Sequence, residues 1–206
     1  MKKIIVIIIL VIIIKYINDE LLGIIHLLNY LLYNKAYSAV PLPKNIRYDL
    51  LQIIAKLPLD RYKFIEFGCA DGEIIELVKN DKKIYKIDGI EIDKDLYTIT
   101  KMRFNKDDNI KIYNDDMQNY KFENTASILY MYEPLWTLDK RKALEIYNNI
   151  FSKIPNNNNF YVIYISGIEQ KLNDNFFYSH NLKKIYEKSI NRIFGNNNIY
   201  LLKFIQ

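Results

Sequence analysis

The chain has 206 residues, which is enough for one domain with a sizeable core and too few for two comfortable ones. Hydrophobic residues make up 50% of it and charged residues 26%, an ordinary composition for a globular protein with some apolar surplus. The net charge of +5 is mild and the lysines are interleaved with acidic residues, which favours a solvated basic surface over a dedicated anion-binding face. The single cysteine, Cys69, excludes an intrachain disulfide framework and fits a reducing compartment.

Much of the apolar surplus lies near the start of the chain. The run from Ile4 to Ile14 would form a helix of about 17 Å, short of the roughly 30 Å of a bilayer core, and the stem of Lys15 extends it to Ile17. No small-residue cleavage site follows. Three alternatives stay open: an uncleaved membrane anchor, an interfacial helix, or a helix buried in a partner. We favour membrane association through residues 4–17, with the remainder in a reducing compartment, and a cytoplasmic location if the segment is not an anchor.

A second apolar pattern at helical spacing predicts a helix over 19–33. Pro41 and Pro43 cannot continue a helix, so we expect an extended linker there. The sequence therefore predicts an apolar, helical N-terminal segment over 1–36 and a folded domain over 37–206.

From Asn45 onward, short apolar strands alternate with helical patterns. We expect helices over 45–57, 72–80, 95–105 and 138–154, and strands over 63–67, 85–92, 110–113, 127–132 and 160–165. Two further strand-like segments, 181–190 and 198–205, flank turn chemistry at Gly195-Asn196-Asn197 and predict a hairpin. The predicted fold is α/β: a doubly wound, mostly parallel seven-stranded sheet with a C-terminal antiparallel hairpin, preceded by N-terminal helices.

The strongest functional signal is the turn after the first predicted strand, E-F-G-C-A-D-G from Glu66 to Gly72. Gly68 allows positive φ, Ala70 is small enough for a ligand to approach the backbone, and Gly72 allows tight packing of the next helix. Dinucleotide-binding turns have the spacing G-x-G-x-x-G, whereas this turn has G-x-A-x-G. The carboxylate of Glu66 would repel a pyrophosphate but would suit a cationic ligand with a free amino group, such as S-adenosylmethionine.

Acidic residues end the next two predicted strands as well. Glu91 lies roughly 20 residues after the glycine turn, where a carboxylate can accept hydrogen bonds from both hydroxyls of a ribose. The third strand is followed by Asp115, Asp116 and Met117. One of the two aspartates would accept from an adenine amino group and Met117 would cover the ring, while the other aspartate can serve as a turn residue.

Together, E-F-G-C-A-D-G, G-I-E-I-D and D-D-M resemble motifs I, II and III of class I S-adenosylmethionine-dependent methyltransferases. The resemblance covers roughly Pro41 to Gln206, and motif I is its most specific part. It implies S-adenosyl-L-methionine as cofactor, held by Glu66, Gly68, Ala70, Gly72, Glu91 and the Asp115–Met117 segment. Ala70 departs from the central glycine usual in that motif.

The N-terminal segment, V-P-L-P and motif I also resemble the small membrane-associated lysine methyltransferases that modify the ATP synthase c-subunit. From this narrower likeness we carry over only a protein lysine as the acceptor.

The fourth strand should end beside the cofactor's methyl group, at Tyr132-Glu133-Pro134-Leu135-Trp136. Methyl transfer is an in-line displacement, so the enzyme chiefly positions a neutral nucleophile and offsets developing charge. We expect Glu133 to accept a hydrogen bond from an attacking amine, and Tyr132 or Trp136 to stack on the substrate or stabilise positive charge. E-P-L-W resembles the [DNS]-P-P-[YFW] signature of amino-methylating enzymes, with two departures. The alternative is a proline turn with a buried tryptophan.

These features predict a methyltransferase acting on a protein or another amine. A nucleic-acid methyltransferase is ranked lower because the basic residues form no clear stripe and a separate target-recognition domain would not fit. A non-catalytic, cofactor-binding partner subunit is the third alternative. No metal site is expected, since the chain has no cluster of Cys and His ligands.

Overall fold

The computed structural model describes residues 44–135, 138–166, 172–192 and 195–204. The predicted helices at 4–17 and 19–33, the proline linker and Trp136 lie outside the described residues. Among the helices that are described, none has the length and hydropathy needed to span a bilayer. A division after Tyr48 separates the chain into two units, and the whole sheet belongs to the second, Asp49–Gln206. The predicted boundary between residues 36 and 37 stays a prediction.

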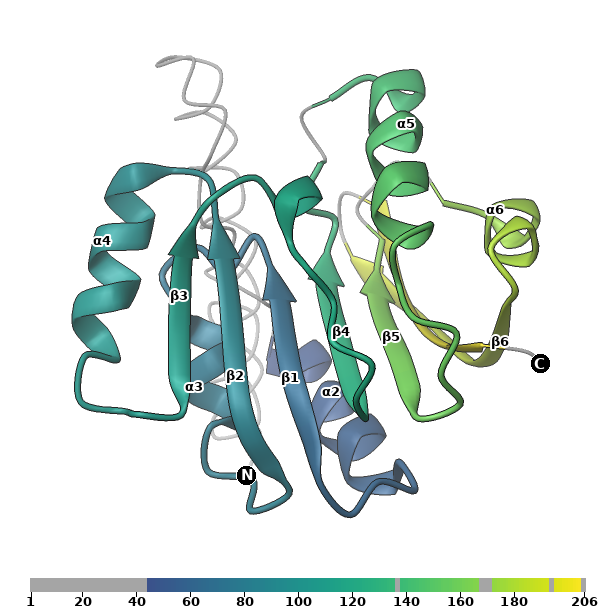
Figure 1. The fold of residues 1–206 in the computed structure, drawn as a ribbon. Helices are drawn as coiled ribbons and strands as arrows, with labels where there is room; N and C mark the ends of the chain where they lie inside the picture. Colours follow the sequence, from purple (N-terminus) through teal and green to yellow (C-terminus); the bar gives the residue numbers. More distant parts are fainter. Residues whose placement is uncertain (1–43, 136–137, 167–171, 193–194, 205–206) are drawn as a thin grey trace, which may run out of the picture. The chain divides into compact units, whose positions relative to one another are not determined.

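The second unit is built on a seven-stranded sheet with the order β3-β2-β1-β4-β5-β7-β6 (Figure 1). The first five strands run parallel to one another, and β7 pairs antiparallel with both β5 and β6. The described elements are α2 (Lys44–Lys56), β1 (Tyr62–Phe67), α3 (Glu73–Val78), β2 (Ile84–Glu91), α4 (Lys94–Arg103), β3 (Ile110–Asn114), the 3-10 turn η1 (Met117–Asn119), β4 (Ser127–Tyr132), α5 (Lys140–Phe151), β5 (Phe160–Ile165), α6 (Asp174–Ser179), β6 (Leu182–Arg192) and β7 (Gly195–Phe204).

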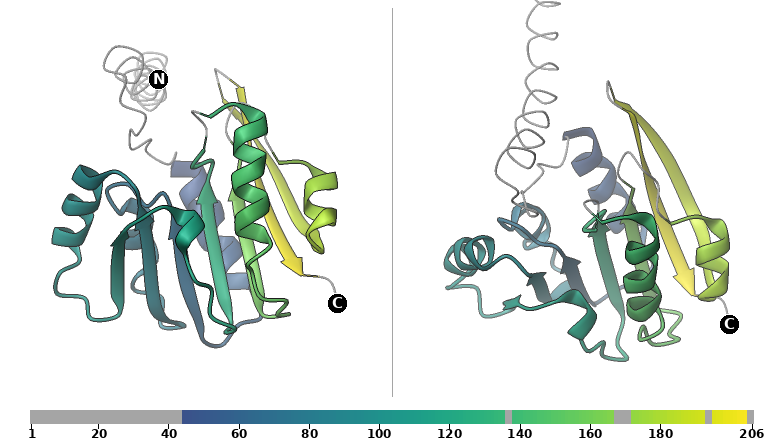
Figure 2. Two further views of the ribbon diagram at one scale, coloured as in Figure 1. Left: turned by 45° about the horizontal axis from the view of Figure 1, so that its top comes forward. Right: turned by 90° about the horizontal axis from the view of Figure 1, so that it is seen from above.

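Helices cover both faces of the sheet, as the sequence predicted. Figures 1 and 2 show α5 and α6 on one face and α3 and α4 on the other. Every residue of β1 and of β5 is buried, which is the pattern of parallel strands packed on both faces. The doubly wound prediction is confirmed.

The C-terminal hairpin is confirmed, but its turn is not where the sequence indicated. Strand β6 continues to Arg192 and β7 begins at Gly195, so Gly195-Asn196-Asn197 belongs to a strand. The Asn197 side chain donates a 2.6 Å hydrogen bond to the carbonyl of Ser166 at the end of β5, and Asn197 is buried. This contact with β5 draws the segment into the sheet, which local turn chemistry does not reveal.

Side-chain caps decide where two of the helices begin. Asp93 accepts hydrogen bonds from the backbone N–H groups of Asp95 and Leu96, so α4 starts at Lys94 with Asp93 as its cap. Asp139 accepts from Lys142, so α5 starts at Lys140 and not at residue 138 as predicted. The two-turn helix α6 was not predicted, because six residues are too few to show helical periodicity.

A buried ion pair connects β1 and β2 in mid-sheet. Lys63 Nζ lies 2.7 Å from Asp88 Oδ2, and the side chains of both residues are almost fully buried. Tyr120 Oη donates to the same carboxylate oxygen over 2.7 Å, and Lys63 also reaches Glu123 at 2.8 Å. The cluster lies toward the amino end of β1 and not at the carboxyl ends of the strands, where the predicted cofactor motifs lie.

Candidate active site

The predicted motifs meet at one edge of the sheet. Strands β2, β1 and β4 are parallel neighbours, with Glu66 beside Gly89 and Tyr130, so their carboxyl ends lie together. In Figure 1 the arrowheads of these strands point to the same edge. In open α/β sheets this edge is where ligands bind.

The turn after β1 has the positive φ that the sequence predicted at Gly68, and positive φ also at Ala70 and Gly72. Gly68 has φ of 70°, Ala70 of 47° and Gly72 of 80°, all in the left-handed region. A Cβ added at Gly72 would lie 2.5 Å from Phe104 Cε2, so α4 packs directly on the glycine. Ala70 tolerates a conformation that favours glycine, which explains why the departure from the usual motif still forms the turn.

Glu91 ties this turn to the end of β2. Its Oε2 accepts a 2.8 Å hydrogen bond from the backbone N–H of Ala70, and its Oε1 accepts one of 2.8 Å from Asp93. Burial raises the pKa of Glu91, while these two backbone hydrogen bonds oppose the rise. Each carboxylate oxygen has a second lone pair, so the group retains capacity for ligand hydroxyls.

Glu66 is a buried carboxylate with an unused acceptor. It is 4% exposed, and its Oε2 has no hydrogen-bond partner among the described residues. Burial raises the pKa of Glu66 well above its ordinary value, and the nearby charges of Glu91, Asp71 and Glu73 raise it further, against a backbone hydrogen bond from Ile75. A cationic group bound here would satisfy the oxygen and relieve the repulsion.

The two aspartates after β3 have different roles in the structure. Asp116 caps η1, with its carboxylate accepting from the backbone N–H of Gln118 at 2.8 Å and from its side chain at 3.2 Å. Asp115 is exposed, and its Oδ1 accepts from Asp116 and Asn119. Met117 is half-buried and packs against the core. Asp115 is therefore the better placed of the two aspartates for the predicted adenine contact, which stays a prediction.

Three further residues shape this edge although the sequence did not single them out. Asn114 Nδ2 donates to the carbonyls of Glu91 at 3.0 Å and Ile92 at 3.1 Å, and so joins the ends of β2 and β3. Thr100 on α4 donates to the carbonyl of Ala70. Ile92 is 47% exposed beside Glu91, where an apolar side chain can cover a ligand ring. An apolar residue between two acids at a strand end, as in G-I-E-I-D, was the available signal for Ile92.

The end of β4 carries two of the residues predicted to act on the methyl acceptor, Tyr132 and Glu133. Tyr132 is half-buried at the strand end, whereas Glu133 is 3% exposed and accepts a hydrogen bond from Tyr164 Oη on β5. Glu133 also has φ of 33°, in the left-handed region. The Glu133 carboxylate is therefore bonded to another strand, and its contact with an acceptor amine stays a prediction.

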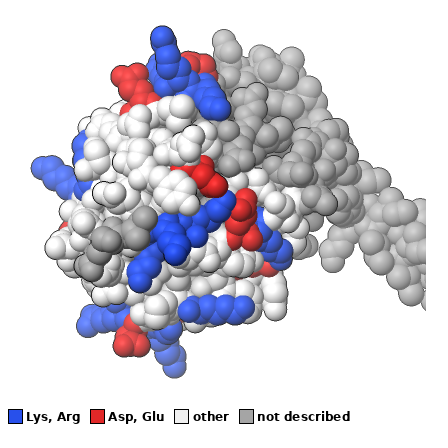
Figure 3. All heavy atoms as spheres, turned by 90° about the vertical axis from the view of Figure 1, so that its right-hand side faces the viewer, with Lys and Arg blue, Asp and Glu red and all other residues white. Residues whose placement is uncertain are grey.

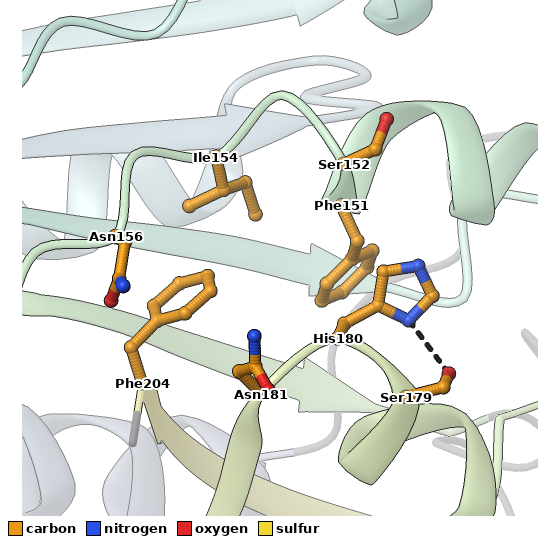
Figure 4. A pocket seen from close by; sticks show the side chains of 8 residues that line it. All are labelled: Phe151, Ser152, Ile154, Asn156, Ser179, His180, Asn181 and Phe204. Atoms are coloured by element: carbon orange, nitrogen blue, oxygen red, sulfur yellow. Dashed lines mark hydrogen bonds between the residues drawn. The ribbon is translucent and has the colours of Figure 1, made fainter. Parts of the chain in front are cut away.

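A separate hollow lies at the opposite end of the sheet. Its volume is about 350 Å³, and it is lined by residues where α5, α6 and β7 end and β5 begins (Figure 4). There His180 Nδ1 lies 3.1 Å from Ser179 Oγ and 2.9 Å from the carbonyl of Phe176, so its ring closes the end of α6. Because it lies at the amino end of β5, this hollow is not part of the site formed by the strand ends.

Comparisons with known proteins establish the fold. No family model and no curated protein sequence matches the chain. The structure is similar to N-methyltransferase NodS from Bradyrhizobium japonicum in complex with S-adenosyl-L-homocysteine, with a TM-score of 0.63, 12% identity, and coverage of 84% of this chain and 90% of that one. It is also similar to magnesium protoporphyrin IX methyltransferase from Synechocystis with bound S-adenosylmethionine, with a TM-score of 0.62, 10% identity and 79% coverage of both chains.

A third similar structure is the tRNA methyltransferase TrmK of B. subtilis, with a TM-score of 0.59, 11% identity, and coverage of 76% of this chain and 65% of that one. The chain therefore has the class I, Rossmann-like fold of S-adenosylmethionine-dependent methyltransferases. The narrower likeness to the lysine methyltransferases of the ATP synthase c-subunit finds no support in these comparisons.

Proposed function

We propose that this protein is an S-adenosylmethionine-dependent methyltransferase that methylates a nitrogen of a protein lysine or another amine. The observation that carries the cofactor assignment is the pair of buried carboxylates at adjacent strand ends. Glu66 has an unpartnered oxygen beside the glycine turn, and Glu91 is oriented by the backbone of Ala70 and Asp93. Such a pair of carboxylates would recognise a cationic amino acid moiety and a ribose diol.

The residues present fit this cofactor. Glu66 would hold the ammonium group, Glu91 the ribose hydroxyls, and Asp115 the adenine amino group, with Ile92 and Met117 against the ring. The positive φ of Gly68 and Ala70 shapes the turn beside these carboxylates. When bound, S-adenosylmethionine supplies an activated methyl group on a sulfonium. The chain's own contribution is to hold the acceptor in line and exclude water, which Tyr132 at the end of β4 and Trp136, four residues later in the sequence, are expected to do.

Two observations support an amine acceptor. The E-P-L-W segment after β4 resembles the signature of amino-methylating enzymes, and one similar structure is that of an N-methyltransferase.

The surface over β6 and α6 offers little to a polyanion. Lys184 pairs with Asp174 and Glu187, and Lys188 pairs with Asp49. Figure 3, which views this side, shows basic side chains beside acidic ones in the middle of the face.

Methylation of RNA is the second candidate, supported by the likeness to a tRNA methyltransferase. It ranks lower because Lys184 and Lys188 of this face are paired with neighbouring acids, so they would release few counterions on binding a nucleic acid. A non-catalytic partner subunit, the third alternative, would bind the cofactor without turnover.

Calorimetry with S-adenosylmethionine tests the cofactor assignment. We expect binding by the wild type and by Glu145→Ala on the exposed face of α5, and none by Gly68→Arg, whose side chain would be forced against Pro134. Absence of binding by the wild type, or equal affinity in Gly68→Arg, would overturn the assignment. A tritiated-methyl transfer assay on protein, RNA and small-molecule fractions of a lysate then separates the three acceptor alternatives.

A further inference from the structure

Glu133 lies at a junction between the end of β4 and the interior of the domain. Its backbone N–H donates a 3.0 Å hydrogen bond to the carbonyl of Ile165, which continues the pairing of β4 with β5. Its φ of 33° then turns the chain out of the strand direction. A non-glycine residue in this region is strained, and it persists only where its surroundings hold it.

One buried tyrosine contacts the Glu133 carboxylate, and a second packs against the first. Tyr164 on β5 donates its hydroxyl hydrogen to Glu133 Oε2. The ring of Tyr147 on α5 stands edge-on to that of Tyr164, with centroids 6.2 Å apart, and burial followed by the charge of Glu133 raises the pKa of Tyr147. Burial, Tyr147 and Glu133 together raise the pKa of Tyr164, so its hydroxyl stays protonated and able to donate. The carboxylate is thus anchored from β5, and Tyr147 on α5 packs against the tyrosine that anchors it.

The residue after Glu133 contacts the cofactor turn. A Cβ placed on Gly68 would lie 3.1 Å from Pro134 Cβ, so the proline packs directly over the first glycine of the turn. The backbone N–H of Gly68 donates a 2.9 Å hydrogen bond to the carbonyl of Ile90 on β2. A shift in the backbone at Glu133 would therefore be transmitted to the turn that carries the cofactor.

We propose that Glu133, Tyr164 and Tyr147 form a positioning cluster that holds the segment after β4 against the cofactor turn. This proposal rests on the proposed function. It gives Glu133 the role of binding another strand of its own chain, and not that of contacting the methyl acceptor. The hydrogen bond from Tyr164 keeps the carboxylate inside, the buried carboxylate maintains the left-handed backbone, and that backbone places Pro134 on Gly68.

The cluster makes a prediction that a catalytic carboxylate does not. Glutamine at position 133 retains an oxygen that can accept from Tyr164, so positioning survives although the charge is lost. Phenylalanine at position 164 removes the donor and leaves a buried carboxylate short of a partner, which favours its rotation toward water and release of the backbone. Combining both changes leaves a neutral amide, which costs less to bury than a carboxylate.

The experiment uses the full chain and four variants: Tyr164→Phe, Glu133→Gln, the double variant, and Tyr161→Phe. Tyr161 is a matched control because it is buried on the same strand but alternates to its other face. Affinity for S-adenosylhomocysteine is measured by calorimetry. Trp136, the only tryptophan of the chain, reports on the segment by fluorescence.

Tyr164→Phe removes one hydrogen bond to a charged group. We therefore expect it to weaken S-adenosylhomocysteine binding roughly tenfold and to shift the Trp136 emission. Glu133→Gln and Tyr161→Phe should stay within about threefold of wild type, and the double variant should bind more tightly than Tyr164→Phe alone. The proposal is overturned if Tyr164→Phe behaves like Tyr161→Phe. It is equally overturned if Glu133→Gln keeps affinity and emission but loses methyl transfer, since the charge would then act on the acceptor.

Failure of the proposed function would look different. In that case the wild type does not bind S-adenosylhomocysteine at all, while the fluorescence comparison still decides the cluster. A shift of the Trp136 emission in Tyr164→Phe that is reversed in the double variant supports the cluster without the cofactor. The absence of any emission shift in Tyr164→Phe overturns the cluster.

Discussion

The backbone N–H of Ala70 donates a 2.8 Å hydrogen bond to the carboxylate of Glu91, so the turn after β1 and the end of β2 are joined before any ligand binds. The residue expected to recognise the ribose thus also supports the turn expected to contact the rest of the cofactor. Recognition and pre-organisation depend on the same side chain, which reduces the ordering that binding would require.

Glu91→Ala removes both roles of this carboxylate. We expect S-adenosylhomocysteine affinity to fall at least ~100-fold, since hydrogen bonds to a charged group contribute about 1.5–3 kcal/mol each. Glu91→Gln keeps one acceptor and should lose less. Calorimetry measures both, with the exposed Glu145→Ala as the control. Equal losses in Glu91→Ala and Glu91→Gln would show that hydrogen-bond acceptance is not what position 91 contributes.

Gly72→Ala should destabilise the fold. The new Cβ would lie 2.5 Å from Phe104 Cε2 and would occupy a backbone with φ of 80°. Left-handed strain and overpacking together predict a loss of about 3 kcal/mol in the free energy of unfolding, measured with urea. Adding Phe104→Leu should recover the packing part of the loss. If it recovers nothing, the clash with Phe104 is not the cause.

Cofactor affinity should rise with pH. The pKa of unliganded Glu66 is raised, mainly by burial, and a bound ammonium group would favour its ionised form, so binding releases a proton. Affinity therefore increases as pH rises from the ordinary glutamate pKa toward the raised pKa of unliganded Glu66. Calorimetry in two buffers of different ionisation enthalpy gives the proton count, and Glu66→Gln should abolish the dependence.

The same pKa shift has the opposite effect on stability without ligand. Because the folded-state pKa of Glu66 is above its unfolded value, its contribution is present at low pH and is lost as pH rises through the folded pKa. Glu66→Gln should therefore melt above the wild type at pH 8 and not at pH 4. A melting difference that is the same at both pH values would contradict this assignment.

Lys63→Met should be among the more damaging substitutions away from the site. It removes the nearer cation of the buried Asp88 and leaves Lys86 Nζ at 4.0 Å; breaking a buried ion pair typically costs about 3–5 kcal/mol of unfolding free energy. The double variant Lys63→Met and Asp88→Leu should recover much of that loss in urea unfolding. Lys79→Met, which removes surface ion pairs to Glu76 and Asp107, should change stability far less.

The apolar N-terminal segment is expected to attach the protein to a membrane. Deletion of residues 1–33 should move the chain from the membrane fraction to the supernatant after sedimentation of a lysate. A milder variant, in which Ser replaces both Lys2 and Lys3, retains the apolar run. Recovery of the full-length chain in the supernatant would refute the attachment.

Local patterns in the sequence were sufficient for the cofactor turn and for most of the sheet. Strand, glycine turn and helix follow one another within a dozen residues from Phe64 to Ile75, so periodicity and turn chemistry specify them without the rest of the chain. The same holds for Glu91 at the end of β2, because parallel neighbouring strands place their ends together whatever the details of packing.

Only the tertiary structure decided how individual side chains at those strand ends are used. Asp115 and Asp116 are adjacent and chemically identical, and it is the η1 turn that occupies Asp116. Glu133 accepts from Tyr164, 31 residues further along, and Asn197 enters the sheet by bonding to Ser166. A hydrogen bond across strands depends on which strands become neighbours and on the face each residue takes, and neither is encoded within one window of sequence.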